Sequence, residues 1–307
     1  MAINLQSLEV RRWLDRIDIE EVAAAARASS VAGEINSFIP ALSRVPRNKF
    51  GLSIYDGSGP LVSIGDASQP FSVQSISKLF ALTILMEKSD GEVWQRLGSN
   101  ASVIERFDSI APLEFSRGIP SNPFLNSGAL VMTDMLLDVS DEPEETVAMM
   151  LHQSIGAALR INGEVAKSEL ETADRNRALA YYLKSYGNLH HPVDRVVEVY
   201  CRMCAIELSS DEVAAFAAQL SASRTQPDNY DRSKLLSVMR DCGLYGESLD
   251  IGRRFGIPAK SGSGGGVLAI LPEGLGLGIW SPPLGACGNS VAGISVLRQF
   301  GRVSAAQ

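Results

Sequence analysis

Hydrophobic and polar positions change their period along the chain, and two pairs of short segments stand out as strands. Residues 51–55 and 61–64 are apolar and rich in β-formers, and the Asp-Gly-Ser-Gly sequence at 56–59 between them is a hairpin signal. Residues 267–271 and 275–280 repeat the pattern on either side of a Pro-Glu-Gly turn. The chain is therefore expected to have strands near both ends.

Most of the sequence between these segments has a helical pattern. Helices are predicted at residues 5–28 (two short helices), 75–88 and 289–300. A long, mostly helical middle is predicted at 127–242, with 165–186 and 193–208 as its clearest helices.

This order of elements predicts an α/β protein of the α+β kind. The early and late strands would meet in one antiparallel sheet that the terminal helices cover. Residues 1–307 would form a single domain, with a sheet subdomain at about 1–70 and 250–307 and a helical subdomain at about 71–249. A cleft between the two subdomains is the expected place for a site.

Composition and charge narrow the classes of partner. With 45% hydrophobic and 21% charged residues, the chain is typical of a globular protein. The net charge of −7 and the absence of a basic run argue against a nucleic-acid partner. The longest strongly apolar stretch, 79–86, is too short for a membrane span, which needs roughly 20 residues. Because the first residues do not resemble a signal peptide, a cytoplasmic location is expected.

Cysteine and histidine positions do not indicate a metal site. Cys201 and Cys204 form a C-x-x-C, but they lie in an apolar helical stretch and have no second ligand pair at zinc spacing. They are interpreted as buried, reduced thiols. His190 and His191 precede a proline in a polar loop, for which a solvated surface is expected.

The sharpest local signal is the S-x-x-K formed by Ser75 and Lys78. Residues three apart on a helix share a face, so the hydroxyl and the amine can be hydrogen-bonded neighbours. A serine becomes a strong nucleophile when a base takes its proton. Lysine can serve as that base only if burial lowers its pKa from about 10.4 toward neutrality. The pattern predicts a nucleophile with an adjacent base, although a solvent-facing lysine is the alternative.

A second motif supports the catalytic interpretation. Lys260-Ser261-Gly262 precedes a predicted strand, and K-[ST]-G after an earlier S-x-x-K is the layout of the serine β-lactamase and penicillin-binding-protein fold. In that layout the backbone N–H groups of Ser75 and Ser263 would form an oxyanion hole.

Several segments together resemble the bacterial and mitochondrial-type glutaminases, in consistent order from about residue 20 to 300. The matching segments are 71–80 (FSVQSISKLF), 121–129 (SNPFLNSGA), 169–184 (ELETADRNRALAYYLK), 256–262 (GIPAKSG) and 280–284 (WSPPL).

The resemblance implies a β-lactamase/transpeptidase-like fold and hydrolysis of L-glutamine to L-glutamate and ammonia, without a metal or organic cofactor. It also implies a homo-oligomer, with a tetramer expected. The substrate contacts that it implies are Ser75, Asn126, Glu169, Asn176, Tyr200, Tyr245 and Ser263.

The residue types agree with this assignment. Glu169 and Asn176 are seven apart, nearly two helical turns, and would share one face of a helix. Glu169 can bind the ammonium group of glutamine, while Asn126, Asn176 and Tyr200 can donate to its carboxylate. Without the resemblance, a surface ion pair for Glu169 and a turn for Asn126 would be preferred.

Tyr245 is a candidate general acid that would shuttle a proton to the departing ammonia. For this residue and for Tyr200, a place in the core is the alternative. Two positions depart from the family pattern. Phe38 stands where a tyrosine is common, and Ser263 stands where K-S-G-V has valine.

Three alternatives to glutamine hydrolysis remain open at this point: another acyl hydrolase, a binding module and a different amide substrate. A β-lactamase or cell-wall peptidase could share the fold, although no S-x-N-type element is evident and export would be needed. A non-catalytic glutamine-binding module would not need a lysine with a lowered pKa. Activity on asparagine depends on the depth of the pocket, since one methylene is worth only about 1–3 kcal/mol.

Overall fold

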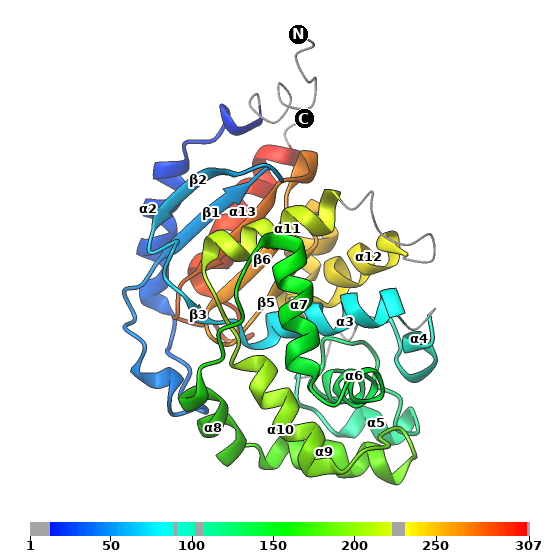
Figure 1. The fold of residues 1–307 in the computed structure, drawn as a ribbon. Helices are drawn as coiled ribbons and strands as arrows, with labels where there is room; N and C mark the ends of the chain where they lie inside the picture. The colour runs from blue at the N-terminus through cyan, green and yellow to red at the C-terminus, as the bar shows by residue number, and fades with distance from the viewer. Residues whose placement is uncertain (1–12, 89–90, 102–106, 223–230, 306–307) are drawn as a thin grey trace.

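The fold is built on a five-stranded antiparallel sheet in the order β2-β1-β7-β6-β5 (Figure 1). The computed structural model describes residues 13–88, 91–101, 107–222 and 231–305. The strands are β1 (Gly51–Tyr55), β2 (Pro60–Gly65), β5 (Ala259–Ser261), β6 (Gly266–Ile270) and β7 (Gly276–Trp280).

The sheet confirms the predicted meeting of early and late strands. β1 and β2 form the expected hairpin, with Leu52 opposite Ile64, and the other edge of β1 pairs with β7, where Leu52 lies opposite Ile279. The prediction missed β5. Lys260 lies within this short strand, opposite Leu268 of β6, so the K-S-G motif begins in the sheet itself.

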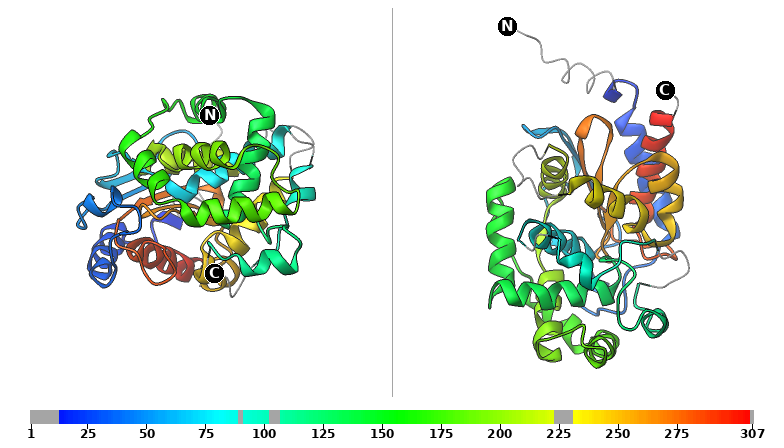
Figure 2. Two further views of the ribbon diagram at one scale, coloured as in Figure 1. Left: turned by 90° about the horizontal axis from the view of Figure 1, so that it is seen from below. Right: turned by 90° about the vertical axis from the view of Figure 1, so that its right-hand side faces the viewer.

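The two faces of the sheet are covered by different helices. Helices α2 (Ile19–Ser29) and α13 (Val291–Ala305) lie side by side on one face (Figure 2). Helix α11 (Ser210–Ala222) covers the opposite face, against β7 and β1. It approaches closely because β7 has glycines there: a Cβ on Gly278 would lie 2.0 Å from the Ser210 carbonyl oxygen. α11 thus packs on the sheet, although its residues fall within the range predicted for the helical subdomain.

The helical region surrounds α3 (Ser77–Lys88), whose residues from Ser77 to Met86 are all buried. A helix without a polar face belongs in the centre of a helical layer. The other helices here are α4 (Val93–Arg96), α5 (Ala111–Phe115), α6 (Asn126–Val139), α7 (Pro143–Ile155), α8 (Gly163–Glu171), α9 (Asp174–Ser185), α10 (Val193–Cys204) and α12 (Arg232–Cys242). Two residue pairs, β3 (Phe71–Ser72) and β4 (Glu207–Leu208), form a small second sheet.

Three predicted helices have different bounds. The α-helix predicted at 75–88 starts only at Ser77, and the helix predicted at 193–208 ends at Cys204 and is followed by β4. The long helix predicted at 165–186 is two helices, α8 and α9, that are separated at residues 172–173. The N-terminal part of the helices predicted at 5–28 lies outside the described residues.

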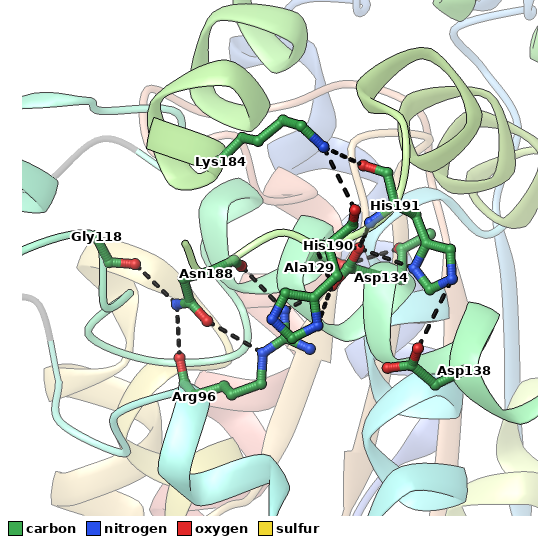
Figure 3. A network of polar contacts seen from close by, with 10 residues as sticks. Arg96, Gly118, Ala129, Asp134, Asp138, Lys184, Asn188, His190 and His191 are labelled. Atoms are coloured by element: carbon green, nitrogen blue, oxygen red, sulfur yellow. Dashed lines mark hydrogen bonds and ion pairs between the residues drawn. The ribbon is translucent and has the colours of Figure 1, made fainter. Parts of the chain in front are cut away.

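A buried carboxylate ties three parts of the helical region together (Figure 3). Asp134 of α6 is fully buried and accepts a 2.6 Å hydrogen bond from Arg96 Nη2 of α4. It also accepts from the backbone N–H of His190 at 2.9 Å and of His191 at 2.8 Å. Although burial acts to raise the pKa of Asp134, these donors outweigh it and the pKa is lowered. The loop predicted to be solvated is therefore anchored through its backbone.

Replacing Asp134 by alanine is expected to destabilise the protein strongly. The Asp134→Ala variant would leave the Arg96 charge and two buried N–H groups without their acceptor, a loss of about 3 kcal/mol in the free energy of unfolding. Asp138 is the matched control, since it is largely exposed and 3.7 Å from His191 Nε2, so Asp138→Ala should cost about 1 kcal/mol or less. Urea unfolding measures both. Equal losses in the two variants would contradict the role given to Asp134.

Candidate active site

A pocket of about 240 Å³ lies where the β5–β6 loop, the turn before α3, the start of α6 and helices α8, α9 and α10 meet. All the predicted substrate-contacting residues except Tyr245 line it, namely Ser75, Asn126, Glu169, Asn176, Tyr200 and Ser263. Residues from six separate segments of the chain are thus brought to one place, at the predicted meeting of the sheet and the helical region.

Ser75 lies in a short 3-10 turn, Gln74–Ile76, and not in the α-helix that was predicted to contain it. Gln74 just before it has a φ of 49°, a left-handed conformation that costs energy for a residue with a side chain. The β5–β6 loop packs directly on this turn: a Cβ on Gly262 would lie 2.2 Å from the Val73 carbonyl oxygen. The glycine-rich sequence after Lys260 is needed for this close approach.

Lys78 lies in the first turn of α3 and is buried. Its amine donates to the Phe124 carbonyl oxygen at 3.1 Å and to Asn126 Oδ1 at 2.7 Å. Burial lowers the pKa of Lys78 to about 8, although nearby acidic groups act in the opposite direction. A neutral amine has two N–H groups and one lone pair, so these two hydrogen bonds leave the lone pair free to accept a proton. The predicted hydrogen bond between Lys78 and Ser75 stays a prediction.

Neutral polar groups surround Asn126, the first residue of α6. Its Oδ1 accepts from Lys78, and the Tyr200 hydroxyl lies 3.3 Å from the same atom. Its Nδ2 donates to Asn176 Oδ1 at 3.0 Å, which leaves the Nδ2 group of Asn176 available as a donor. Asn126, Asn176 and Tyr200 therefore form one connected group on the pocket wall.

Glu169 supplies a carboxylate to the same pocket. It is buried, and Gln74 Nε2 donates to its Oε2 at 3.2 Å. Burial raises the pKa of Glu169 to about 7, although the Gln74 hydrogen bond and the charge of Lys78 act in the opposite direction. The expectation that Glu169 and Asn176 share one face of a single helix is wrong, because Glu169 lies in the last turn of α8 and Asn176 in the first turn of α9. The break between the helices still leaves both side chains on the pocket.

Tyr245 does not line the pocket but lies beside its serine. Burial raises the pKa of Tyr245 to about 12, against the effect of a hydrogen bond with Ser75. Its φ of 51° is also left-handed. Behind it, the fully buried Lys260 amine lies 3.3 Å from the Tyr245 hydroxyl and 2.6 Å from the Ser261 carbonyl oxygen. Burial and the charge of Lys78 lower the pKa of Lys260 well below its usual range.

Sequence reasoning missed several pocket residues. Gln74 lies in the matching segment 71–80 and had no predicted role, yet it contacts both Glu169 and Ser263. Arg175 and Asp108 also line the pocket, where Arg175 Nε donates to the Asp108 carbonyl oxygen at 2.9 Å. No motif marked Asp108, whereas the position of Gln74 next to the predicted nucleophile was a usable signal.

Cys201 and Cys204 are buried free thiols on α10, as predicted. Across the described part of the chain, no group of three or more His, Cys, Asp or Glu side chains is placed to hold a metal ion. Within the same residues, no helix is long and apolar enough to cross a bilayer.

The fold and the site together define the structural class of this protein. An antiparallel sheet is covered on one face by the two terminal helices, and a helical region brings a serine and a buried lysine of the S-x-x-K pattern to the loop that follows a K-S-G strand. This arrangement is the β-lactamase-like fold.

Comparisons with known proteins identify the family within this class. The glutaminase family model matches residues 33–305. A glutaminase of Ralstonia nicotianae is 40% identical over 273 residues, which cover 86% of this chain and 90% of the relative. A glutaminase of Paraburkholderia phytofirmans is 37% identical over 287 residues, which cover 91% and 94%. The chain belongs to the glutaminase family of amidohydrolases.

Solved structures agree with this assignment. A probable glutaminase from Bacillus subtilis, complexed with 6-diazo-5-oxo-L-norleucine, superposes with a TM-score of 0.80 at 30% identity, covering 92% of each chain. The protein Mglu in its glutamate form gives a TM-score of 0.82 at 29% identity, covering 92% of this chain and 66% of the other.

Proposed function

We propose that this protein hydrolyses the side-chain amide of free L-glutamine to L-glutamate and ammonia, with Ser75 as nucleophile and Lys78 as base. The observation that carries the proposal is the pocket itself. It combines a serine, one buried carboxylate and a group of neutral donors, and a buried lysine whose pKa is lowered to about 8 lies in the helix that follows the serine. The family and the small-molecule ligands of its relatives support the same substrate class.

The polar groups suit the two charged ends of an amino acid. The Glu169 carboxylate would bind the α-ammonium group. The α-carboxylate would accept hydrogen bonds from Asn126, Asn176 and Tyr200, which carry no charge of their own to compete with it. A pocket that offers Glu169 to the ammonium group and several neutral donors to the carboxylate favours a zwitterion over a plain amide, because each charged end then has a hydrogen-bonding partner.

The proposed reaction starts when neutral Lys78 accepts the proton of the Ser75 hydroxyl. The serine oxygen attacks the side-chain amide carbon, and the backbone N–H groups of Ser75 and Ser263 hold the resulting oxyanion. As the C–N bond breaks, the Tyr245 hydroxyl delivers a proton to the nitrogen and ammonia leaves. Water then attacks the glutamyl ester and gives one proton to the Tyr245 phenolate. As the ester C–O bond breaks, protonated Lys78 returns its proton to the Ser75 oxygen, and L-glutamate departs.

Two other functions are weighed against this proposal. A β-lactamase or cell-wall peptidase of the same fold would form a stable penicillin adduct on Ser75. A glutamine-binding module would bind glutamine without releasing ammonia. The lowered pKa of Lys78 favours catalysis over binding alone, because binding does not require a base. The homo-oligomer, expected as a tetramer, remains a prediction that light scattering can measure.

Ammonia release from L-glutamine, D-glutamine and L-asparagine tests the proposed function. We expect release from L-glutamine with a kcat/KM at least about tenfold above that for L-asparagine, because one methylene is worth about 1–3 kcal/mol. Binding of L-glutamine by calorimetry without ammonia release would contradict the proposal in favour of the binding module. Preferred release from L-asparagine would assign a different substrate to the same site.

A further inference from the structure

The side chain of Gln74 connects two walls of the pocket. It is buried, with 2% of its surface exposed. Its Nε2 donates to Glu169 Oε2 at 3.2 Å and to Ser72 Oγ at 3.0 Å, so both of its N–H groups have acceptors. Its Oε1 accepts from Ser263 Oγ at 3.2 Å. The amide therefore lies between the hydroxyl of the β5–β6 loop and the carboxylate of α8.

Only one orientation of this amide suits the carboxylate. With Nε2 toward Glu169, the amide donates to an anion. Turned over, it would place Oε1 against the carboxylate oxygens, which are also acceptors. The Ser263 hydroxyl donates to Oε1 and so stabilises the first orientation. Ser263 is itself held, because Asn36 Nδ2 donates to its carbonyl oxygen at 3.1 Å.

We propose that Ser263 is a specificity-determining positioning residue whose hydroxyl fixes the Gln74 amide, which in turn donates to Glu169 and aims its carboxylate at the substrate's α-ammonium group. The inference deepens the proposed function and rests on it. Ser263 acts through its side chain here, in addition to its backbone N–H. A hydroxyl at this position is a property of this chain, since valine follows K-S-G in the pattern that the chain otherwise resembles.

The role concerns the ammonium end of the ligand alone, and this allows a discriminating test. Ser263→Thr and Ser263→Val have side chains of nearly the same shape, and only threonine keeps a hydroxyl. L-Glutamate and glutarate are matched ligands, because glutarate lacks only the α-ammonium group. Calorimetry at pH 8 measures the affinity of each variant for each ligand. The four values show whether the loss of the hydroxyl weakens binding only when the ligand has an α-ammonium group.

The Val variant is expected to bind L-glutamate about threefold to tenfold more weakly than the Thr variant, the usual range for one hydrogen bond. Glutarate should bind both variants equally, or bind neither. In L-glutamine turnover, the Val variant should have a higher KM than the Thr variant, with kcat within about twofold of the Thr variant. Equal affinity of the two variants for L-glutamate would overturn the inference. So would a loss that is the same for glutarate, because a merely structural role would affect both ligands alike.

Failure of this inference can be told apart from failure of the proposed function. If the wild-type protein releases ammonia from L-glutamine while the Thr and Val variants bind L-glutamate equally, only the role of the Ser263 hydroxyl is wrong. If the wild-type protein releases no ammonia from L-glutamine, the proposed function itself is wrong.

Discussion

The Ser75→Ala variant is expected to lose about 10⁴–10⁶-fold in kcat for L-glutamine, as serine hydrolases do when their nucleophile is removed. Without the hydroxyl there is no atom to form the acyl bond, and water in its place is neither positioned nor activated by the same base. The residues that would bind the two charged ends of the ligand are untouched. L-Glutamate should therefore bind with an affinity within about threefold of the wild type. Ammonia release measures the first effect and calorimetry the second.

Ser77 provides the matched control for this experiment. It is a neighbouring serine at the start of α3, and its hydroxyl lies 4.0 Å from Cys204 Sγ. Ser77→Ala removes a hydroxyl from the same S-x-x-K segment without touching the proposed nucleophile, and kcat should stay within about tenfold. If Ser75→Ala keeps wild-type turnover, or if Ser77→Ala loses as much, the nucleophile has been assigned to the wrong residue.

The Lys78→Met variant is expected to lose about 10³–10⁴-fold in kcat, the upper range for removal of a general base. Methionine fills a similar volume in the buried interior of α3, so the main change is the missing lone pair. Stability at pH 7 should change by less than about 2 kcal/mol, because methionine removes the cost of a buried, protonated lysine but leaves the Phe124 and Asn126 oxygens without its hydrogen bonds. Lys88→Met, at the exposed end of the same helix, is the control and should have wild-type turnover. An active Lys78→Met variant would exclude Lys78 as the base.

The pH dependence of the wild-type protein tests the same base. The pKa of Lys78 is lowered to about 8, so the neutral form that accepts a proton dominates only above that pH. The pKa of Glu169 is raised to about 7, so its anionic form also increases with pH. Both groups therefore require kcat/KM to rise from pH 6 to pH 9, because kcat/KM reports the pKa values of the free protein. It should be at least about 100-fold lower at pH 6, two units below the pKa of the base. A kcat/KM that is flat across this range would contradict a lysine base.

Much of the scaffold could be predicted from local patterns. The β1–β2 hairpin follows from alternating β-formers around a tight turn, and both pairs of predicted strands are found in the sheet. The S-x-x-K spacing singled out Ser75 and Lys78 as candidates, and the structure places the first in a 3-10 turn and the second in the helix that follows. In each case the signal is carried by residues that are close in sequence.

The remaining site residues were brought in by the resemblance, and sequence spacing gave a wrong reason for one pair. Glu169 and Asn176 were placed on one helix, whereas α8 ends and α9 begins between them. Similarly, α11 has an ordinary helical pattern that cannot tell whether it packs on helices or on a sheet. Glycines of β7, far away in the chain, decide that it lies on the sheet.

By itself, the sequence determined the hairpin, the buried helix α3, the late strands and the serine–lysine pair, because local periodicity and turn chemistry act over a few residues. Only the tertiary structure decided the contacts that set charge and orientation. The lowered pKa of Lys78, the raised pKa of Glu169 and the link from Ser263 through Gln74 to Glu169 all depend on desolvation and on partners far apart in the chain. Burial and long-range hydrogen bonding exist only once the chain has folded.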